Sequence, residues 1–302
     1  MKPPPFTYHR PESLDEALAV LAETRSDGKV LAGGQSLLPI LSLRLAAPGH
    51  LVDINRLTDL AYVRSDVDGV RVGALARHAD VERDDAAASA QPLLRQALRL
   101  VAHPTIRNRG TSVGSLAHAD PSGELTAVLA LTAGSVTLAS TAGRREVPAA
   151  EFFLGPMESS IGPGELAVEA FFPAFPGRTG TAFVEVSRRH GDYAVCGVAA
   201  AATLDPDGAV TDALAAFLTM GPVPVAVDVG PAARTAGLRL PDAVEPAAWR
   251  SVAAVATEGL EPDSDIHATA AYRAELARVL AARALAAAAA RAGSDLGEEG
   301  ER

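Results

Sequence analysis

Cysteine, lysine and aromatic residues are scarce in this chain of 302 residues. Its single cysteine, Cys196, excludes a disulfide framework, a cysteine-rich zinc site and any iron-sulfur cluster bound by this chain alone. The net charge of −10, with lysine only at Lys2 and Lys29, argues against a nucleic-acid surface, because phosphate binding requires clustered positive charge. Because one cysteine cannot bind an iron-sulfur cluster, an organic cofactor or a partner chain must carry electrons if the protein transfers them.

Long hydrophobic runs are also lacking. The N-terminal sequence MKPPPFTYHR has no apolar core of a signal peptide, and the alanine-rich stretch Ala281 to Ala292 contains arginines and favours a helix instead. The seven histidines show no HxH or HExxH spacing, so the sequence indicates no metal site. We expect a cytoplasmic, soluble protein with no membrane insertion and no nucleic-acid partner.

The first 55 residues have the pattern of a small α/β unit. Pro11 to Thr24 predicts a helix, because Ser13 and Glu16 have the spacing of a capping box and apolar residues recur on one face. Val30 to Ala32 and His50 to Ile54 predict short strands on either side of a glycine turn.

A second α/β unit extends to about Pro173, and a cluster of Pro and Gly from Pro173 to Gly180 predicts a domain boundary there. We expect the domains to span residues 1–57, 58–175 and 180–290, with a disordered tail over 291–302. The predicted strands are Val70–Leu75, Ser135–Ser140, Arg145–Val147, Ala182–Val186, Ala194–Leu204 and Val210–Met220, and the predicted helices are Pro92–Val101, Leu125–Leu131, Ala247–Glu258 and Ala268–Ala290.

The stretch Lys29 to Leu45, KVLAGGQSLLPILSLRL, reads as a strand, a tight turn and a helix start. Gly33 and Gly34 permit positive φ angles and leave backbone amides accessible, so an anion such as a phosphate would fit there. The stretch matches neither GxGxxG nor a P-loop. Taken alone, a Gly-Gly turn is more often only a turn.

A second glycine-bearing stretch, Arg107 to Glu124, reads RNRGTSVGSLAHADPSGE. We expect Gly110 and Gly114 to lie in a polar loop whose amides and hydroxyls hold phosphate oxygens. Asp120 and Glu124 follow within reach of the same region, and a carboxylate at that distance could accept hydrogen bonds from ribose or ribityl hydroxyls, as acidic residues do in dinucleotide folds. The hydroxyls in question belong to Thr111, Ser112 and Ser115, and the other polar residues nearby are His118 and Asp120.

These stretches give the chain a resemblance to the FAD-binding, or medium, subunits of the molybdenum hydroxylases, which include carbon monoxide, xanthine and aldehyde dehydrogenases. AGGQSLLPILSLRL resembles the first flavin-phosphate loop of that family, and NRGTSVGSLAHADPSGEL resembles the second. HLVDINRL, VPAAEFFLGP, SRRHGDYAVCGVAAAATL and YRAELARVLAARAL also resemble family segments, in the expected order. The resemblance extends from about Phe6 to Ala290.

The resemblance implies an α+β protein. Two α/β FAD-binding subdomains, similar to those of PCMH-type flavoproteins such as vanillyl-alcohol oxidase, would enclose an extended FAD and precede an α+β C-terminal domain of the CO dehydrogenase flavoprotein type. It assigns His118 to a polar position of the second loop, Glu124 to sugar or ribityl hydroxyls and Tyr193 to the isoalloxazine ring. The cofactor-binding residues would be Leu31, Ala32, Gly33, Gly34, Gln35, Ser36, Leu37, Thr111, Ser112, Val113, Gly114, Ser115, His118, Glu124 and Tyr193, with no catalytic side chain and no metal ligand.

Val113 departs from the family pattern, in which two glycines commonly occupy positions 113 and 114. A β-branched residue is costly if the backbone there needs positive φ, and harmless if it does not. Other side chains leave alternatives open. His118 beside Asp120 reads either as a binding histidine or as a proton-transfer pair, and the former is favoured. Arg107 and Arg109 could contact phosphates or pair with Asp120 and Glu124.

Further along the chain, Arg188 and Arg189 could form an ion pair with Asp192 at a domain interface or belong to a solvated surface cluster. Cys196 lies in an apolar strand and is expected to be a buried, inert thiol.

The resemblance leads to one hypothesis and leaves two alternatives. The chain would be the electron-exit subunit of a heteromeric enzyme, with molybdenum-pterin on a large partner subunit and two [2Fe-2S] clusters on a small one. Electrons would reach FAD on this chain and leave to NAD+, O2 or a quinone-linked acceptor. The alternatives are a stand-alone FAD-dependent oxidase or dehydrogenase, and a non-catalytic scaffold with a degraded flavin site.

Overall fold

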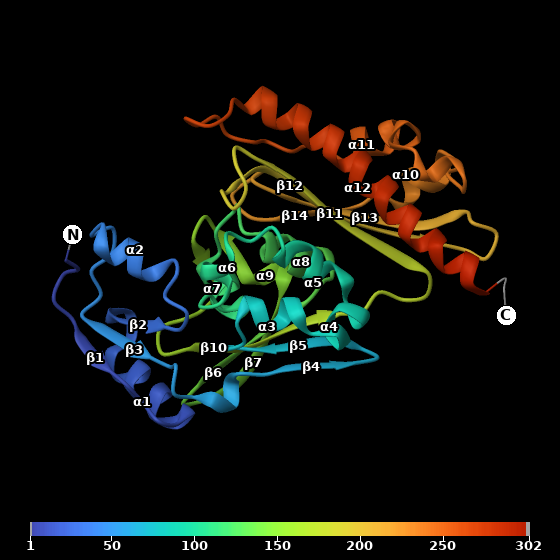
Figure 1. The fold of residues 1–302 in the computed structure, drawn as a ribbon. Coiled ribbons are helices and arrows are strands. Elements are labelled where there is room, and N and C mark those ends of the chain that lie inside the picture. Colours follow the sequence, from blue (N-terminus) through green and yellow to red (C-terminus); the bar gives the residue numbers. More distant parts are fainter. Residues whose placement is uncertain (1, 300–302) are drawn as a thin grey trace.

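A computed structural model describes residues 2–299 and shows three main β-sheets in succession along the chain (Figure 1). The first lies at the N-terminal end, the second in the middle, and the third beside the second under the long C-terminal helix. Within residues 2–299, no helix is long and apolar enough to cross a membrane.

The first sheet has three parallel strands in the order β1-β3-β2. Helix α1 (Leu14–Thr24) connects two of them, and its N-terminus is capped as predicted, because the Ser13 hydroxyl accepts a hydrogen bond from the Glu16 amide at 3.2 Å. The small α/β unit is thus confirmed, although β1 was not predicted. The other elements are β1 (Thr7–His9), η1 (Arg25–Asp27), β2 (Gly28–Leu31), α2 (Leu37–Ser42), β3 (His50–Asp53) and η2 (Thr58–Leu60).

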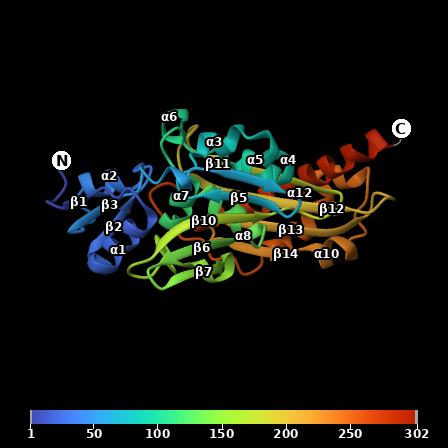
Figure 2. The same ribbon diagram turned by 90° about the horizontal axis from the view of Figure 1, so that it is seen from below.

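The second sheet has five antiparallel strands in the order β4-β5-β10-β6-β7, with helices packed on one side (Figure 2). The predicted hairpin of β6 and β7 is confirmed, whereas β4 and the central strand β10 were not predicted. The strands are β4 (Val63–Asp66), β5 (Gly69–Gly73), β6 (Ser135–Ser140), β7 (Gly143–Pro148) and β10 (Leu166–Pro173), and β8 (Phe153–Gly155) pairs with β9 (Glu158–Ser159). The helices are α3 (His78–Arg83), α4 (Asp85–Ala90), α5 (Pro92–Leu98), α6 (Pro104–Arg107), α7 (Ser112–His118), α8 (Glu124–Leu131) and α9 (Ala149–Phe152).

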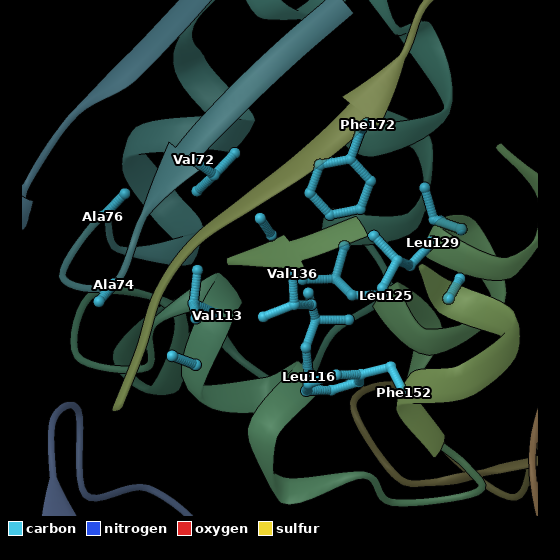
Figure 3. Close-up of a cluster of buried hydrophobic side chains, with 14 of the residues drawn as sticks. Val72, Ala74, Ala76, Val113, Leu116, Leu125, Leu129, Val136, Phe152 and Phe172 are labelled. Carbon is cyan, nitrogen blue, oxygen red and sulfur yellow. The ribbon is translucent and has the colours of Figure 1, made fainter. Parts of the chain in front are cut away.

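Helix α7 corrects the prediction of a polar loop around Gly114. Val113 and Leu116 are three residues apart, so they share one face of the helix, and they are 1% and 0% exposed. Figure 3 shows both within the cluster that also contains Val136 and Phe152. Burial of this face therefore outweighs the low helix propensity of the glycine and serine residues in the segment.

The third sheet has four antiparallel strands in the order β11-β12-β13-β14, and α12 lies across one face of it (Figure 1). The approach is close: a Cβ built on Gly180 would lie 2.1 Å from the carbonyl oxygen of Ala288 in the helix. The elements are β11 (Thr179–Ser187), β12 (Ala194–Leu204), β13 (Val210–Leu218), β14 (Val225–Asp228), α10 (Gly230–Thr235), η3 (Asp242–Val244), η4 (Pro246–Trp249), α11 (Arg250–Ala256) and α12 (Ala270–Glu299).

The expected disordered tail is replaced by helix over residues 291–299, because α12 continues to Glu299. The segment reads RAGSDLGEE, in which two glycines, a serine and an aspartate oppose the better helix formers, so helix propensity alone did not predict this extension. The last part of the tail, residues 300–302, lies outside the described residues.

The second and third sheets are joined by direct contacts. The Gln96 side chain on α5 donates to the Thr181 hydroxyl on β11 at 3.1 Å, and the Thr219 amide after β13 donates to the Pro121 carbonyl at 2.9 Å. Phe183 of β11 is buried in the same apolar cluster as α5 and α8. The end of the second glycine stretch therefore lies at the junction with the C-terminal sheet.

Candidate functional site

The first glycine turn connects β2 to α2. Leu31 ends the strand, Ala32 to Ser36 form the turn and Leu37 begins the helix. Gly34 has φ +73°, a conformation that costs a residue with a side chain about 1–2 kcal/mol. Gln35 steadies the turn by donating from Nε2 to the Gly33 carbonyl at 3.1 Å.

Gly33 brings this turn against the second glycine stretch. Its φ is not in the left-handed region, so its role is close approach: a Cβ there would lie 2.3 Å from the Arg109 carbonyl oxygen and 2.8 Å from Gly110 Cα. Both neighbours are backbone atoms and cannot move as a flexible side chain can. The two stretches that the sequence predicted to share a ligand are therefore in contact.

Asn55 and Arg77 tie the two stretches together, and sequence reasoning missed both. Asn55 Nδ2 donates to the Ala32 carbonyl at 2.8 Å, and Arg77 Nη2 donates to Asn55 Oδ1 at 2.8 Å. Arg77 Nη1 also donates to the Arg109 carbonyl at 2.7 Å. Burial and the nearby Arg109 guanidinium lower the pKa of Arg77. One available signal was that Asn55 follows directly after the end of a predicted strand, where polar residues often serve a site.

Ser112 and Thr111, in the middle of the second stretch, differ in their hydrogen bonding. Ser112 is fully buried, and its hydroxyl lies 3.3 Å from Nδ1 of His78, whose pKa falls to about 4 mainly through burial. The imidazole is therefore neutral, and Ser112 is already paired with it. Thr111 occupies the N-cap position of α7 without a side-chain capping hydrogen bond, and a Cβ on Gly114 would lie 2.4 Å from its Oγ1.

The Thr111 hydroxyl oxygen, Oγ1, is buried and has no hydrogen-bond partner among residues 2–299. A buried hydroxyl without a partner costs free energy, so such groups in proteins normally meet water or a ligand. Thr111 Oγ1 lies beside Gly114, and Gly33 approaches Arg109, two residues before Thr111 in the same stretch, at a distance that leaves no room for a Cβ. The residues present therefore fit an oxygen-rich group such as a pyrophosphate, bound close to the backbone.

Val113 does not disturb this arrangement. It lies within α7, has no positive φ, and its side chain is directed into the apolar core (Figure 3). The condition under which the departure from the family pattern would be costly is therefore not met.

Carboxyl groups and Tyr193 form the edge of the site nearest the C-terminal sheet. Burial raises the pKa of Glu124 at the start of α8 to about 8, and the nearby carboxylates of Glu185 and Asp120 add to the effect. Burial alone raises the pKa of Glu185 on β11 to about 7. Desolvation and the charges of Asp120 and Glu124 raise the pKa of Tyr193, which places that residue near both.

His118 is half-buried, and burial lowers its pKa while Asp120 opposes the effect. Asp120 Oδ1 accepts from the Ser122 amide at 2.8 Å, and the part of the chain that is described shows no hydrogen bond from His118 to this carboxylate. The proton-transfer pair considered from sequence is therefore not formed.

The remaining polar residues have local roles. Arg107 pairs with Glu82 at 2.8 Å and donates to backbone carbonyls, so it takes neither of the roles considered from sequence. Arg188 pairs with Asp192 within its own loop at 2.9 Å. Cys196 is buried, and burial raises its pKa to about 12, which confirms an inert thiol. The described residues contain no group of three or more potential ligands for a metal ion.

Two family models match the chain in succession. The model described as "FAD binding domain in molybdopterin dehydrogenase" matches residues 4–175, and the one described as "CO dehydrogenase flavoprotein C-terminal domain" matches residues 181–288. The first covers the two glycine turns, and the second covers the third sheet and most of α12.

Curated relatives and solved structures agree with these matches. The chain is 40% identical over 292 residues to the 6-hydroxypseudooxynicotine dehydrogenase complex subunit alpha of Paenarthrobacter nicotinovorans, covering 97% of each chain. It is 36% identical to the carbon monoxide dehydrogenase medium chain of Hydrogenophaga pseudoflava, covering 96% of this chain and 99% of the relative.

Among solved structures, carbon monoxide dehydrogenase from H. pseudoflava superimposes with a TM-score of 0.87 at 37% identity, covering 96% of this chain and 99% of that one. Quinoline 2-oxidoreductase from Pseudomonas putida 86 does so with a TM-score of 0.88 at 35% identity, covering 97% and 99%. The chain therefore belongs to the family of FAD-binding flavoprotein subunits of molybdenum hydroxylases, the oxidoreductases of the carbon monoxide and xanthine dehydrogenase type.

Proposed function

We propose that the two glycine turns hold the pyrophosphate of FAD between them. The observation that carries this proposal is the contact of Gly33 with Arg109 and Gly110, on a stretch whose Thr111 Oγ1 is buried without a partner. In this proposal the first turn contributes residues 31–37, and the second contributes Thr111 and the amides up to Ser115. Asn55 and Arg77 act as positioning residues, because their hydrogen bonds run between the two turns.

Glu124 and Tyr193 are proposed to contact the other end of the cofactor. A carboxyl group with a pKa of about 8 keeps its proton at neutral pH, so Glu124 can both donate a hydrogen bond to a ribityl hydroxyl and accept one. Tyr193 is 65% exposed and lies near Glu124, which suits a side chain that covers one face of an isoalloxazine ring. His118 is kept as a binding residue of the second turn.

Bound FAD supplies the capacity to accept electrons singly or in pairs, and this chain supplies position and electrostatics. We propose that electrons arrive from [2Fe-2S] clusters on a small partner subunit, after substrate oxidation at molybdenum-pterin on a large one, and leave to NAD+, O2 or a quinone-linked acceptor. The single cysteine supports this division of labour, since the chain alone cannot ligate a cluster. We further propose that residues 1–57 and 58–175 act as the two halves of the flavin site and residues 180–290 as a separate domain.

Co-expression with candidate molybdenum and iron-sulfur subunits tests the electron path. The purified complex is reduced anaerobically by substrate while flavin absorbance is followed. We expect bleaching only when all three chains are present. Bleaching of the isolated chain by substrate would instead support a stand-alone oxidase or dehydrogenase, and a chain that copurifies with its partners but carries no flavin would support a scaffold.

A further inference from the structure

A small cavity of about 100 Å³ lies beside the proposed flavin site, within the C-terminal part of the chain. It opens between the loop that connects β11 to β12 and the segment that precedes α12. Tyr193 lines it, as does Ser122 near the end of the second glycine stretch, whereas residues 31–37 and 111–115 of the two turns do not. Its hydrogen-bonding side chains include Arg188, Arg273, His267, Ser122 and Thr219, together with the carboxylates of Asp192 and Asp265.

The two carboxylates in the cavity wall already accept hydrogen bonds from other groups of the protein. Asp265 accepts from the amides of His267 and Ala268 at 2.7 and 3.0 Å and from Arg273 Nη2 at 2.7 Å. These bonds lower its pKa to about 2, so it stays ionised and bound to its partners. Asp192 accepts from Arg188 at 2.9 Å and from the Tyr193 amide at 3.1 Å. Each carboxylate of the wall is therefore already paired with one of the two guanidinium groups of the wall.

Arg273 provides the donor that requires explanation. The residue is only 8% exposed; its Nη2 binds Asp265, and its Nη1 donates to the Asp263 carbonyl at 3.2 Å. Its Nε is buried without a hydrogen-bond partner anywhere in residues 2–299. An unpaired N–H of a buried guanidinium is costly, and Arg273 lines the cavity, so the cavity is where a partner for this group would be bound.

The size and the donors together define the occupant. A volume of about 100 Å³ corresponds to roughly three water molecules, which is also the room that one small oxyanion takes. Two guanidinium groups and an imidazole suit a carboxylate or phosphate group better than a neutral molecule. We infer that this cavity is a binding site for a small free oxyanion, such as inorganic phosphate or a short carboxylate, held by Arg273 with Arg188 and His267.

Calorimetric titration of the purified full-length chain with inorganic phosphate, and separately with formate, tests the inference. Both are expected to bind, and Arg273→Gln is expected to weaken binding by about ten- to a hundredfold, the effect of losing one hydrogen bond to a charged group. Arg278→Gln is the matched control, because Arg278 lies on the same helix in an exposed pair with Glu275 and does not line the cavity. Its affinity should equal that of the unchanged chain.

A second variant guards against misfolding, because Arg273 also holds Asp265. His267 is exposed, so His267→Ala should fold normally and still bind either anion several-fold more weakly. A folded chain that binds neither anion would overturn the inference, as would equal affinity in all variants. The cavity shares Tyr193 with the proposed flavin contacts, but Arg273, Arg188 and His267 are not among those contacts. The titration can be made on flavin-free protein, so its failure is distinguishable from failure of the proposed flavin site.

Discussion

Replacing Gly33 by alanine is a direct perturbation of the contact between the two glycine turns. The added Cβ would lie 2.3 Å from the Arg109 carbonyl oxygen, whereas ordinary contact begins at 3.4 Å, so the turns must separate by about 1 Å. A shift of that size breaks hydrogen bonds from both sides to a shared phosphate group. One or two bonds to a charged group, at about 1.5–3 kcal/mol each, correspond to a loss of FAD affinity of about a hundredfold or more.

The assay is fluorescence titration of flavin-free protein with FAD, together with the flavin content of the protein as purified. Gly221→Ala is the control: Gly221 lacks a positive φ, and the nearest atom to its added Cβ lies at 3.6 Å. That variant should retain full flavin, and circular dichroism should show both variants folded. Unchanged FAD affinity in folded Gly33→Ala would refute the claim that the two turns grip one pyrophosphate.

Three further outcomes are expected. Thr111→Val should lower FAD affinity about tenfold in the same titration with little loss of stability, because the deleted hydroxyl has no protein partner; unchanged affinity would exclude it as a ligand. Val113→Ala should lower the free energy of unfolding by about 2 kcal/mol in urea titration while flavin content stays full, since the side chain fills the core; a colourless, equally stable protein would contradict this. The pKa of Glu124 is raised to about 8 in the folded chain, so its contribution to stability is complete below its unfolded pKa and is lost as pH rises through 8. The melting temperature of flavin-free protein should therefore fall between the unfolded pKa of the carboxyl group and pH 8, and Glu124→Gln should flatten this fall. An unchanged slope in the variant would contradict the buried, protonated carboxyl.

Local patterns in the sequence were sufficient to predict several strands and helices. The strand predicted over Ala194–Leu204 has the same bounds as β12, because a long apolar run between turn residues leaves little choice. The hairpin of β6 and β7 was also predicted, since apolar alternation and Gly143, at φ +131°, mark its turn. A helix was predicted over Ala268–Ala290, but α12 continues to Glu299. The predicted end was too early because the polar and charged residues from Ser294 onward were expected to be disordered.

Other features depend on contacts between distant residues. Strand β10 is central in its sheet, and Val168, Ala170 and Phe172 on one face are buried while Glu169, Phe171 and Pro173 are only partly buried. Leu166–Pro173 shows no clean alternation in sequence, because apolar residues occupy both faces. Helix α7 depends on the burial of Val113 and Leu116, which the surrounding glycine and serine residues conceal in the sequence. Asn55 and Arg77 act through side-chain hydrogen bonds to backbone atoms of other segments, and such pairing leaves no periodicity to read.

The proximity of the two glycine turns was predicted only through the family resemblance, and Gly33 gives the physical reason for it in this chain. The sequence could indicate that both turns suit an anion. It could not show that they meet, because 76 residues separate Gly33 from Arg109 and only tertiary contacts, among them those of Asn55 and Arg77, bring them together.

We propose that electrons pass through FAD held by this chain on their way to the acceptor. The most direct test is to deplete FAD from the assembled complex, then measure anaerobic reduction of the [2Fe-2S] clusters by substrate alongside reduction of the external acceptor. Without FAD the clusters should still be reduced while acceptor reduction is lost, and reloading with FAD should restore it. Acceptor reduction at an undiminished rate in the FAD-depleted complex would contradict the account.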